Sequence, residues 1–151
     1  MFRLNRLLVA GAVVVGTLAL APWLSSATTG GCAVPSAAVS QYLSVTGNSI
    51  LNSLSSDKQI CKNQCQQLRN GCQNVVKSAV RCVKVSNKAD SSGQARACND
   101  LTGSSKQSCK DSVKSNSDAI LNFISSDRQS AESTCESAFQ SCLADCAGSE
   151  D

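Results

Sequence analysis

The spacing of the cysteines constrains this chain more than any other feature. Three cysteines near position 65 follow the pattern C-x3-C-x6-C, and the last three repeat it in reverse as C-x6-C-x3-C. Facing positions on two antiparallel helices have residue numbers with a constant sum, because both helices rise equally per residue. The sequence therefore predicts a ladder of disulfides between two antiparallel helices. The pairs whose residue numbers sum to 207 are Cys61 with Cys146, Cys65 with Cys142, Cys72 with Cys135, and Cys98 with Cys109.

The apolar residues recur at steps of three, four and seven, which is the period of an α-helix. We expect an all-α, disulfide-stapled antiparallel bundle with coiled-coil character and helices over about 36–54, 57–87 and 105–147. A loop is expected over 88–104, because this stretch is polar and contains two glycines. A break of the last helix near residue 126 would raise the number of helices from three to four.

An internal repeat supports a symmetric arrangement. Residues 50–59 (ILNSLSSDKQ) match residues 120–129 (ILNFISSDRQ) at an offset of 70, and the same offset superposes the two C-x6-C pairs. This pattern indicates the duplication of a helical unit. Each copy contains a Ser-x-x-Gln sequence of the kind that caps a helix. Asp57 and Asp127 are then expected in the first turns of the helices that these sequences begin.

The two cysteines outside the constant sum are Cys32 and Cys82. If the chain folds back at Ser56, residue 36 comes near residue 76, and Cys32 comes near Cys82. We therefore expect a fifth bridge between these two residues, which would place all ten cysteines in disulfides.

The N-terminal residues are typical of an export signal. Arg3 and Arg6 precede an apolar run of 14 residues, which is short for a membrane span, and small residues lead up to Ala27. We expect residues 1–27 to be removed as a secretory signal peptide, leaving 28–151 as a single helical domain without an integral span, secreted or in the periplasm. The alternative is a lipoprotein anchored through Cys32.

The charges are segregated along the chain. Residues 58–114 contain 11 basic and three acidic residues, whereas 118–151 contain seven acidic residues and one basic residue. In the constant-sum register Lys62 faces Asp145, and Arg69 lies close to Glu136, which favours the antiparallel pairing. Without the signal segment the chain is nearly neutral, so a nucleic-acid partner is not expected.

Three classes of function compete for the cysteines. The first is a structural or interaction protein whose disulfides reinforce a thin core. The second is storage of Cu(I) on thiolates: the chain faintly resembles exported, cysteine-lined helical bundles that store copper, in its helix content and its C-x3-C spacing. It departs from them because it has no histidine and no methionine beyond Met1. The third is thiol–disulfide exchange, which usually relies on C-x-x-C at the start of a helix.

We expect a non-enzymatic protein without a cofactor, since the missing histidine removes the usual general base and nucleophile pairs. The expected functional surface is the segment 86–108. It contains Lys88, Arg96 and Lys106, and we expect an unidentified protein partner to bind there.

Overall fold

The computed structural model describes residues 28–29 and 31–147, so the expected signal segment 1–27 lies outside the described residues. The fold is all-α, with three helical segments packed against one another and one pair of two-residue strands. The elements are β1 (Thr28–Thr29), β2 (Cys32–Ala33), α1 (Pro35–Tyr42), a π-helical segment (Leu43–Gly47), α2 (Asn48–Leu51), α3 (Lys58–Ala97), a 3₁₀ turn (Cys98–Asp100) and α4 (Gly103–Ala147).

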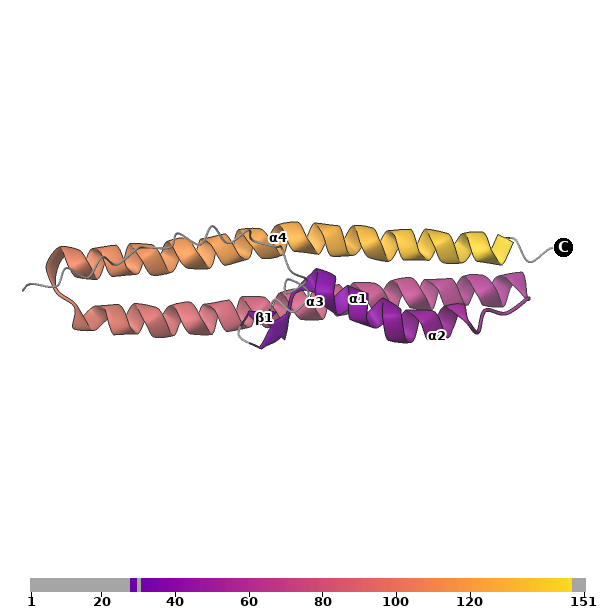
Figure 1. Cartoon of the computed structure of the whole chain (residues 1–151), viewed down its shortest axis with the longest axis horizontal. Helices are drawn as coiled ribbons and strands as arrows, with labels where there is room; N and C mark the ends of the chain where they lie inside the picture. The colour runs from indigo at the N-terminus through magenta and orange to yellow at the C-terminus, as the bar shows by residue number, and fades with distance from the viewer. Residues whose placement is uncertain (1–27, 30, 148–151) are drawn as a thin grey trace, which may run out of the picture.

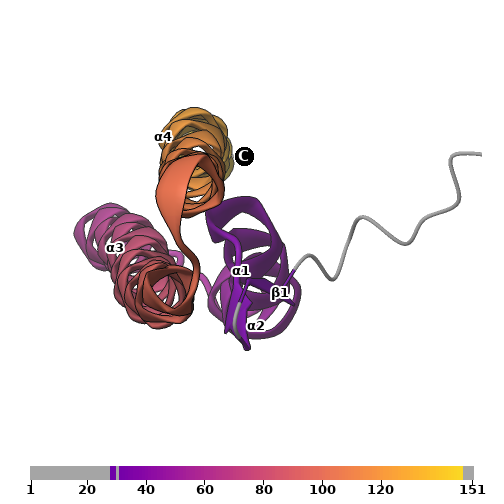
Figure 2. The same cartoon turned by 90° about the vertical axis from the view of Figure 1, so that its left-hand side faces the viewer.

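The two long helices, α3 and α4, form an antiparallel hairpin that runs the length of the molecule (Figure 1). α1, the π-helical segment and α2 continue one another and lie beside only one half of this hairpin, the half that contains the C-terminal end of α4. Seen end on, the three rods occupy the corners of a triangle (Figure 2). The other half of the hairpin, residues 84–120, therefore projects as a pair of helices, which we call the arm.

The chain folds back over residues 52–57, and a single side chain begins the next helix. Asp57 is the N-cap of α3, and its Oδ1 accepts hydrogen bonds from the backbone N–H groups of Gln59 and Ile60 at 2.9 Å each. These N–H groups have no partner within the helix, which is why a carboxylate is favoured there. The expected cap by Ser56 is thus replaced by Asp57, which precedes the first turn rather than belonging to it.

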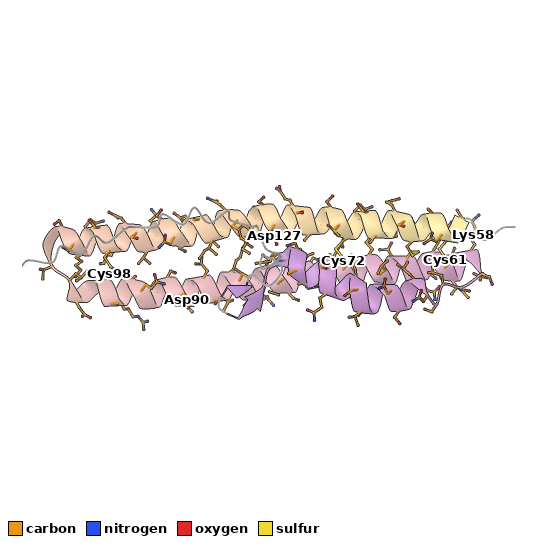
Figure 3. The ribbon with its side chains drawn as sticks, in the orientation of Figure 1. Lys58, Cys61, Cys72, Asp90, Cys98 and Asp127 are labelled. Carbon is orange, nitrogen blue, oxygen red and sulfur yellow. A yellow bond between two sulfur atoms is a disulfide. The ribbon has the colours of Figure 1, made fainter. Side chains whose placement is uncertain are left out.

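Asp127 is the residue of the second repeat that corresponds to Asp57, and it also caps the start of a helix. Asp127 lies in the middle of α4, and its Oδ2 accepts a hydrogen bond of 2.9 Å from the backbone N–H of Ser36 in the first turn of α1. Figure 3 shows Asp127 where α1 begins. The expected place of Asp127 in the first turn of a helix of its own was therefore wrong, because it caps a helix that is 91 residues away in the sequence.

The last helix has no break near residue 126, since α4 is continuous from Gly103 to Ala147. The polar residues Ser125 and Ser126 lie on its exposed surface, while Ile124 and Ala131 on either side of them are buried on one stripe. No glycine or proline interrupts this stretch. Burial of this stripe on both sides of the polar residues therefore keeps α4 continuous, and the fold has three helical rods rather than four.

The apolar core lies in the half that α1 covers. One cluster joins Val34 and Val39 to the α3–α4 seam, and a second gathers Leu68 and Phe139 around the end bridges. In the arm, by contrast, the only fully buried positions among the described residues are Asn87 and Cys98. The covered half is thus the stable body of the molecule, and the arm depends on other interactions.

Candidate functional site: a disulfide ladder and a projecting arm

Three disulfides form a ladder between α3 and α4. They join Cys61 to Cys146, Cys65 to Cys142 and Cys72 to Cys135, with Cα–Cα distances of 5.6 to 5.8 Å. Every one of these sulfurs belongs to a side chain with at most 4% of its surface exposed. The rungs are the pairs that the constant sum predicts, and they fix the register of the two helices.

Two further disulfides hold the remaining elements. Cys32–Cys82 fastens the strand pair and the start of α1 to α3, and Cys98–Cys109 closes the tip of the arm. These are also the pairs expected from the sequence. All ten cysteines lie among the described residues, and none of them is free.

The two rungs at the end of the ladder bring four sulfur atoms close together. The Sγ atoms of Cys61, Cys65 and Cys146 lie within 4.8 Å of one another, and Cys65 Sγ is 3.4 Å from Cys146 Sγ although the two are not bonded. This proximity arises because Cys61 and Cys65 stand one helical turn apart, as do Cys142 and Cys146. As disulfides these sulfurs are not thiolates, whereas in reduced form they would make a cluster of soft metal ligands.

The segment expected to be a loop is mostly helical, so the prediction of a loop over 88–104 was wrong. α3 continues to Ala97, α4 begins at Gly103, and only a short turn with Cys98–Asp100 separates them. Gly103 has a φ of +59°, a conformation that favours glycine, and this allows the chain to reverse there. The 86–108 segment is therefore the mostly helical end of the arm rather than a surface loop.

The helices of the arm meet through a polar seam. The side-chain amide of Asn87, which has 4% of its surface exposed, donates to both the carbonyl oxygen and the hydroxyl of Ser117, at 3.3 and 3.0 Å. Farther along, the half-buried residues of α3 are Ser91 and Ala95. Small side chains let the two backbones approach, and the Cys98–Cys109 bridge secures the end. The Ser and Gly content of one segment does not reveal this pairing, because the residues that α3 contacts here belong to α4.

Ion pairs form both between the two helices of the hairpin and within α4. Arg69 of α3 pairs with Glu136 of α4 at 2.8 Å, and its guanidinium lies 4.8 Å from the ring centroid of Phe139. The charge asymmetry had placed these two residues close together. Arg128 pairs with Glu132 within α4 at 2.7 Å. Arg81 lies with Lys77, Lys84 and Arg128 around a shallow hollow of about 340 Å³.

Comparison of the chain with protein-family models, curated proteins and solved structures gives no match. Among the described residues, no helix is both long enough and apolar enough to cross a membrane. The features of the protein that bear on function are therefore the ladder, the arm and the distribution of charge.

Proposed function

We propose that the chain is an exported, non-enzymatic protein of the cell envelope or the extracellular space, in which a disulfide ladder holds a helical arm for interaction with a partner. The observation that carries this proposal is the complete pairing of the ten cysteines. Five disulfides persist in oxidising compartments and are rare in the cytosol. A rigid body that projects a thin arm, with its apolar core confined to the body, suits presentation of a surface better than enclosure of a substrate.

The position of Cys32 supports secretion in soluble form over the lipoprotein alternative. A lipoprotein anchor occupies the sulfur of the modified cysteine, so this sulfur cannot also form a disulfide. Cys32 Sγ is bonded to Cys82, and Cys32 has 6% of its surface exposed. We therefore infer cleavage before the strand pair, with Thr28 as the first residue of the exported protein.

The proposal is tested by expressing the full chain in a host that exports it through an oxidising compartment. We expect N-terminal sequencing to start at Thr28, and denatured, unreduced protein to contain almost no titratable thiol. A non-reducing peptide map should show the five pairs of the structure. A lipid-modified Cys32, or a protein that remains in the cytosol with reduced cysteines, would contradict the proposal.

The second candidate function is Cu(I) storage, and the sulfur cluster of Cys61, Cys65 and Cys146 is the observation that favours it. It requires thiolates, so binding should follow reduction of the ladder. The same thiol titration separates the two functions. A purified protein with many free thiols and several equivalents of copper would make storage the better explanation, whereas a metal-free protein without thiols supports the structural role.

A further inference from the structure

The basic residues of α3 follow a positional rule. Six of them directly follow a buried residue that lies in the contact between α3 and α4, the seam, or at its edge. These six residues therefore share one side of the helix. These residues are Lys62, Arg69, Lys77, Arg81, Lys84 and Lys88, which follow Cys61, Leu68, Val76, Val80, Val83 and Asn87. Because successive residues are about 100° apart around a helix, the whole set lies on the side of α3 just past the seam.

This side faces away from α1. The residues that precede the seam positions contact the N-terminal segment: Gly71 lies under Tyr42, and Cys82 is bonded to Cys32. A residue before the seam and a residue after it point about 200° apart. Figure 2 shows α1 and α2 on one side of the α3–α4 pair, which leaves the opposite side uncovered.

α4 adds cations to the same side. In an antiparallel helix pair, residues that follow the seam on either helix lie on one common face of the pair. Lys110 and Lys114 follow Cys109 and Val113, which are half-buried seam residues, and Arg128 lines the same hollow as Lys77, Arg81 and Lys84. We call this surface the basic face; its members are Lys77, Arg81, Lys84, Lys88, Lys110, Lys114 and Arg128.

Carboxylates lie beside α4 members of the basic face but not beside its row of cations on α3. Nearer the C-terminal end of α4, Glu136 forms an ion pair with Arg69, and Glu132 forms an ion pair with Arg128. Within residues 28–29 and 31–147, no carboxylate lies at ion-pair distance from Lys77, Arg81, Lys84 or Lys88. Asp111 and Asp118 share a separate hollow with Lys114. Like charges so concentrated repel one another, and binding of an anion would relieve this repulsion.

We propose that the basic face binds a linear anionic polysaccharide, which deepens the proposed function by naming the partner of an exported interaction protein. The four cations of α3 lie in a row about 17 Å long, a length that a short stretch of a charged polymer can follow. The hollow that Lys77, Arg81 and Lys84 line is shallow, and Val80 and the exposed Val85 also line it. Such a surface offers the polymer charge along its length and a small apolar contact for the sugar rings.

The other partners fit this face less well. A specific protein partner would usually need a central aromatic or arginine anchor seated in a pocket, and a single-stranded nucleic acid would need aromatic side chains for base stacking. Binding to a lipid surface would need large apolar side chains that enter the bilayer. The seven residues of the basic face include no aromatic residue, and the apolar residues that line its hollow are Val80 and Val85.

The test measures binding of the oxidised protein to a size-defined sulfated oligosaccharide and to a carboxylated oligosaccharide of equal charge, by calorimetry over a range of salt concentrations. The variant replaces Arg81, Lys84 and Lys88 by Gln. The matched control replaces Lys62, Arg96 and Lys106 by Gln, which removes the same charge elsewhere. Circular dichroism and an unreduced gel verify that both variants keep the fold and the disulfides.

We expect the basic-face variant to lose affinity on the order of tenfold at low salt and to lower the salt slope by roughly two to three, while the control changes little. The two oligosaccharides show whether sulfate or carboxylate is preferred. Undetectable binding, or equal loss in both variants, would overturn the proposal. So would tighter binding to an acidic helical peptide, to single-stranded DNA or to anionic vesicles. None of these results depends on export or on the thiol count, so the proposed function is judged separately.

Discussion

The contact between Cys65 Sγ and Cys146 Sγ, at 3.4 Å, sets two neighbouring disulfides in position for exchange. If Cys146 were a thiolate, it could attack Cys65, form a Cys65–Cys146 bond and release Cys142 as the new thiolate. No external oxidant or reductant is consumed in this step. In the native protein the step is blocked because Cys146 is held by Cys61.

The substitution Cys61→Ser should therefore rearrange the end of the ladder. We expect part of the protein to carry a Cys65–Cys146 bond with Cys142 free, reached over minutes to hours at mildly alkaline pH. Alkylation of free thiols followed by a non-reducing peptide map measures this directly. Cys135→Ser is the control: it frees Cys72, whose nearest rung stands seven residues, about 10 Å, along the helix. If Cys146 alone were labelled in Cys61→Ser, exchange between the rungs would be refuted.

At the scale of the elements, one close approach contributes to the docking of α1 on α3. Tyr42 lies across Gly71 of α3, and its hydroxyl donates to the carbonyl oxygen of Leu68 at 3.4 Å. Burial raises the pKa of Tyr42 above its ordinary value of 10, so the hydroxyl keeps its proton throughout the neutral range. A side chain at position 71 would meet the tyrosine ring and hydroxyl.

We predict that Gly71→Ala destabilises the protein while Gly93→Ala on the same helix does not. Alanine at position 71 must displace Tyr42, which should cost about 1–3 kcal/mol against a helix-propensity gain of about 1 kcal/mol. No atom lies within 4 Å of the corresponding position at Gly93, so there the propensity gain should remain. Thermal unfolding of the two variants side by side measures the difference. An equal rise in melting temperature for both would show that Tyr42 does not pack against position 71.

The element boundaries also show how far sequence reasoning reaches. The cysteine numbering anticipated the pairs and the register because a disulfide ladder has only one arithmetic solution on two antiparallel helices. The loop over 88–104 failed because Ser and Gly content is a local signal, whereas the helix there is continued by the contact of Asn87 with Ser117 and by the Cys98–Cys109 bridge. The cap that Asp127 provides for α1 is likewise a long-range contact without a local signature.

The basic face was partly visible in the sequence. The blockwise charge asymmetry in the sequence predicts pairing between a basic and an acidic helix; this is a narrower interpretation than the structure supports. That interpretation holds for Arg69 and Glu136. Farther along, residues 119–130 of α4, which face the cations of α3 from Lys77 to Lys88, contain a single carboxylate, that of Asp127, and it accepts a hydrogen bond from Ser36 of α1. These basic residues of α3 share one side of the helix because each of them directly follows a buried residue.

At the scale of the whole molecule, the body and the arm should differ in how they respond to loss of a bridge. The body contains both apolar clusters, the three disulfides of the ladder and Cys32–Cys82. The arm has a polar seam and a single disulfide, Cys98–Cys109, whose cysteines are 11 residues apart in the sequence. Opening of the arm therefore exposes little apolar surface, and we expect it to fray locally while the body unfolds cooperatively.

We predict that Cys72→Ser with Cys135→Ser lowers the melting temperature far more than Cys98→Ser with Cys109→Ser. The loop-closure entropy alone does not predict a different melting temperature for the two double variants. With Cys65–Cys142 intact, the lost rung opens only the ring of residues 65–72 and 135–142, worth about 3 kcal/mol, and the tip bridge closes a ring worth about the same. The difference arises from the surroundings: Cys72 and Cys135 are buried within the apolar core, whereas Cys98, which is also buried, and the half-buried Cys109 lie in the arm outside both apolar clusters. Serine hydroxyls placed in that core cost a further 1–3 kcal/mol or so each.

Differential scanning calorimetry measures the melting of both double variants, and amide hydrogen exchange locates the change. The tip variant should lose protection mainly in residues 84–120 and keep a melting transition close to that of the parent protein. The rung variant should melt early throughout the body, and full reduction should remove most of the helical circular dichroism signal. A reduced protein that kept its helicity and its melting temperature would show that the cysteines are not needed for the fold, and Cu(I) storage would then become the better account of why the chain has ten of them.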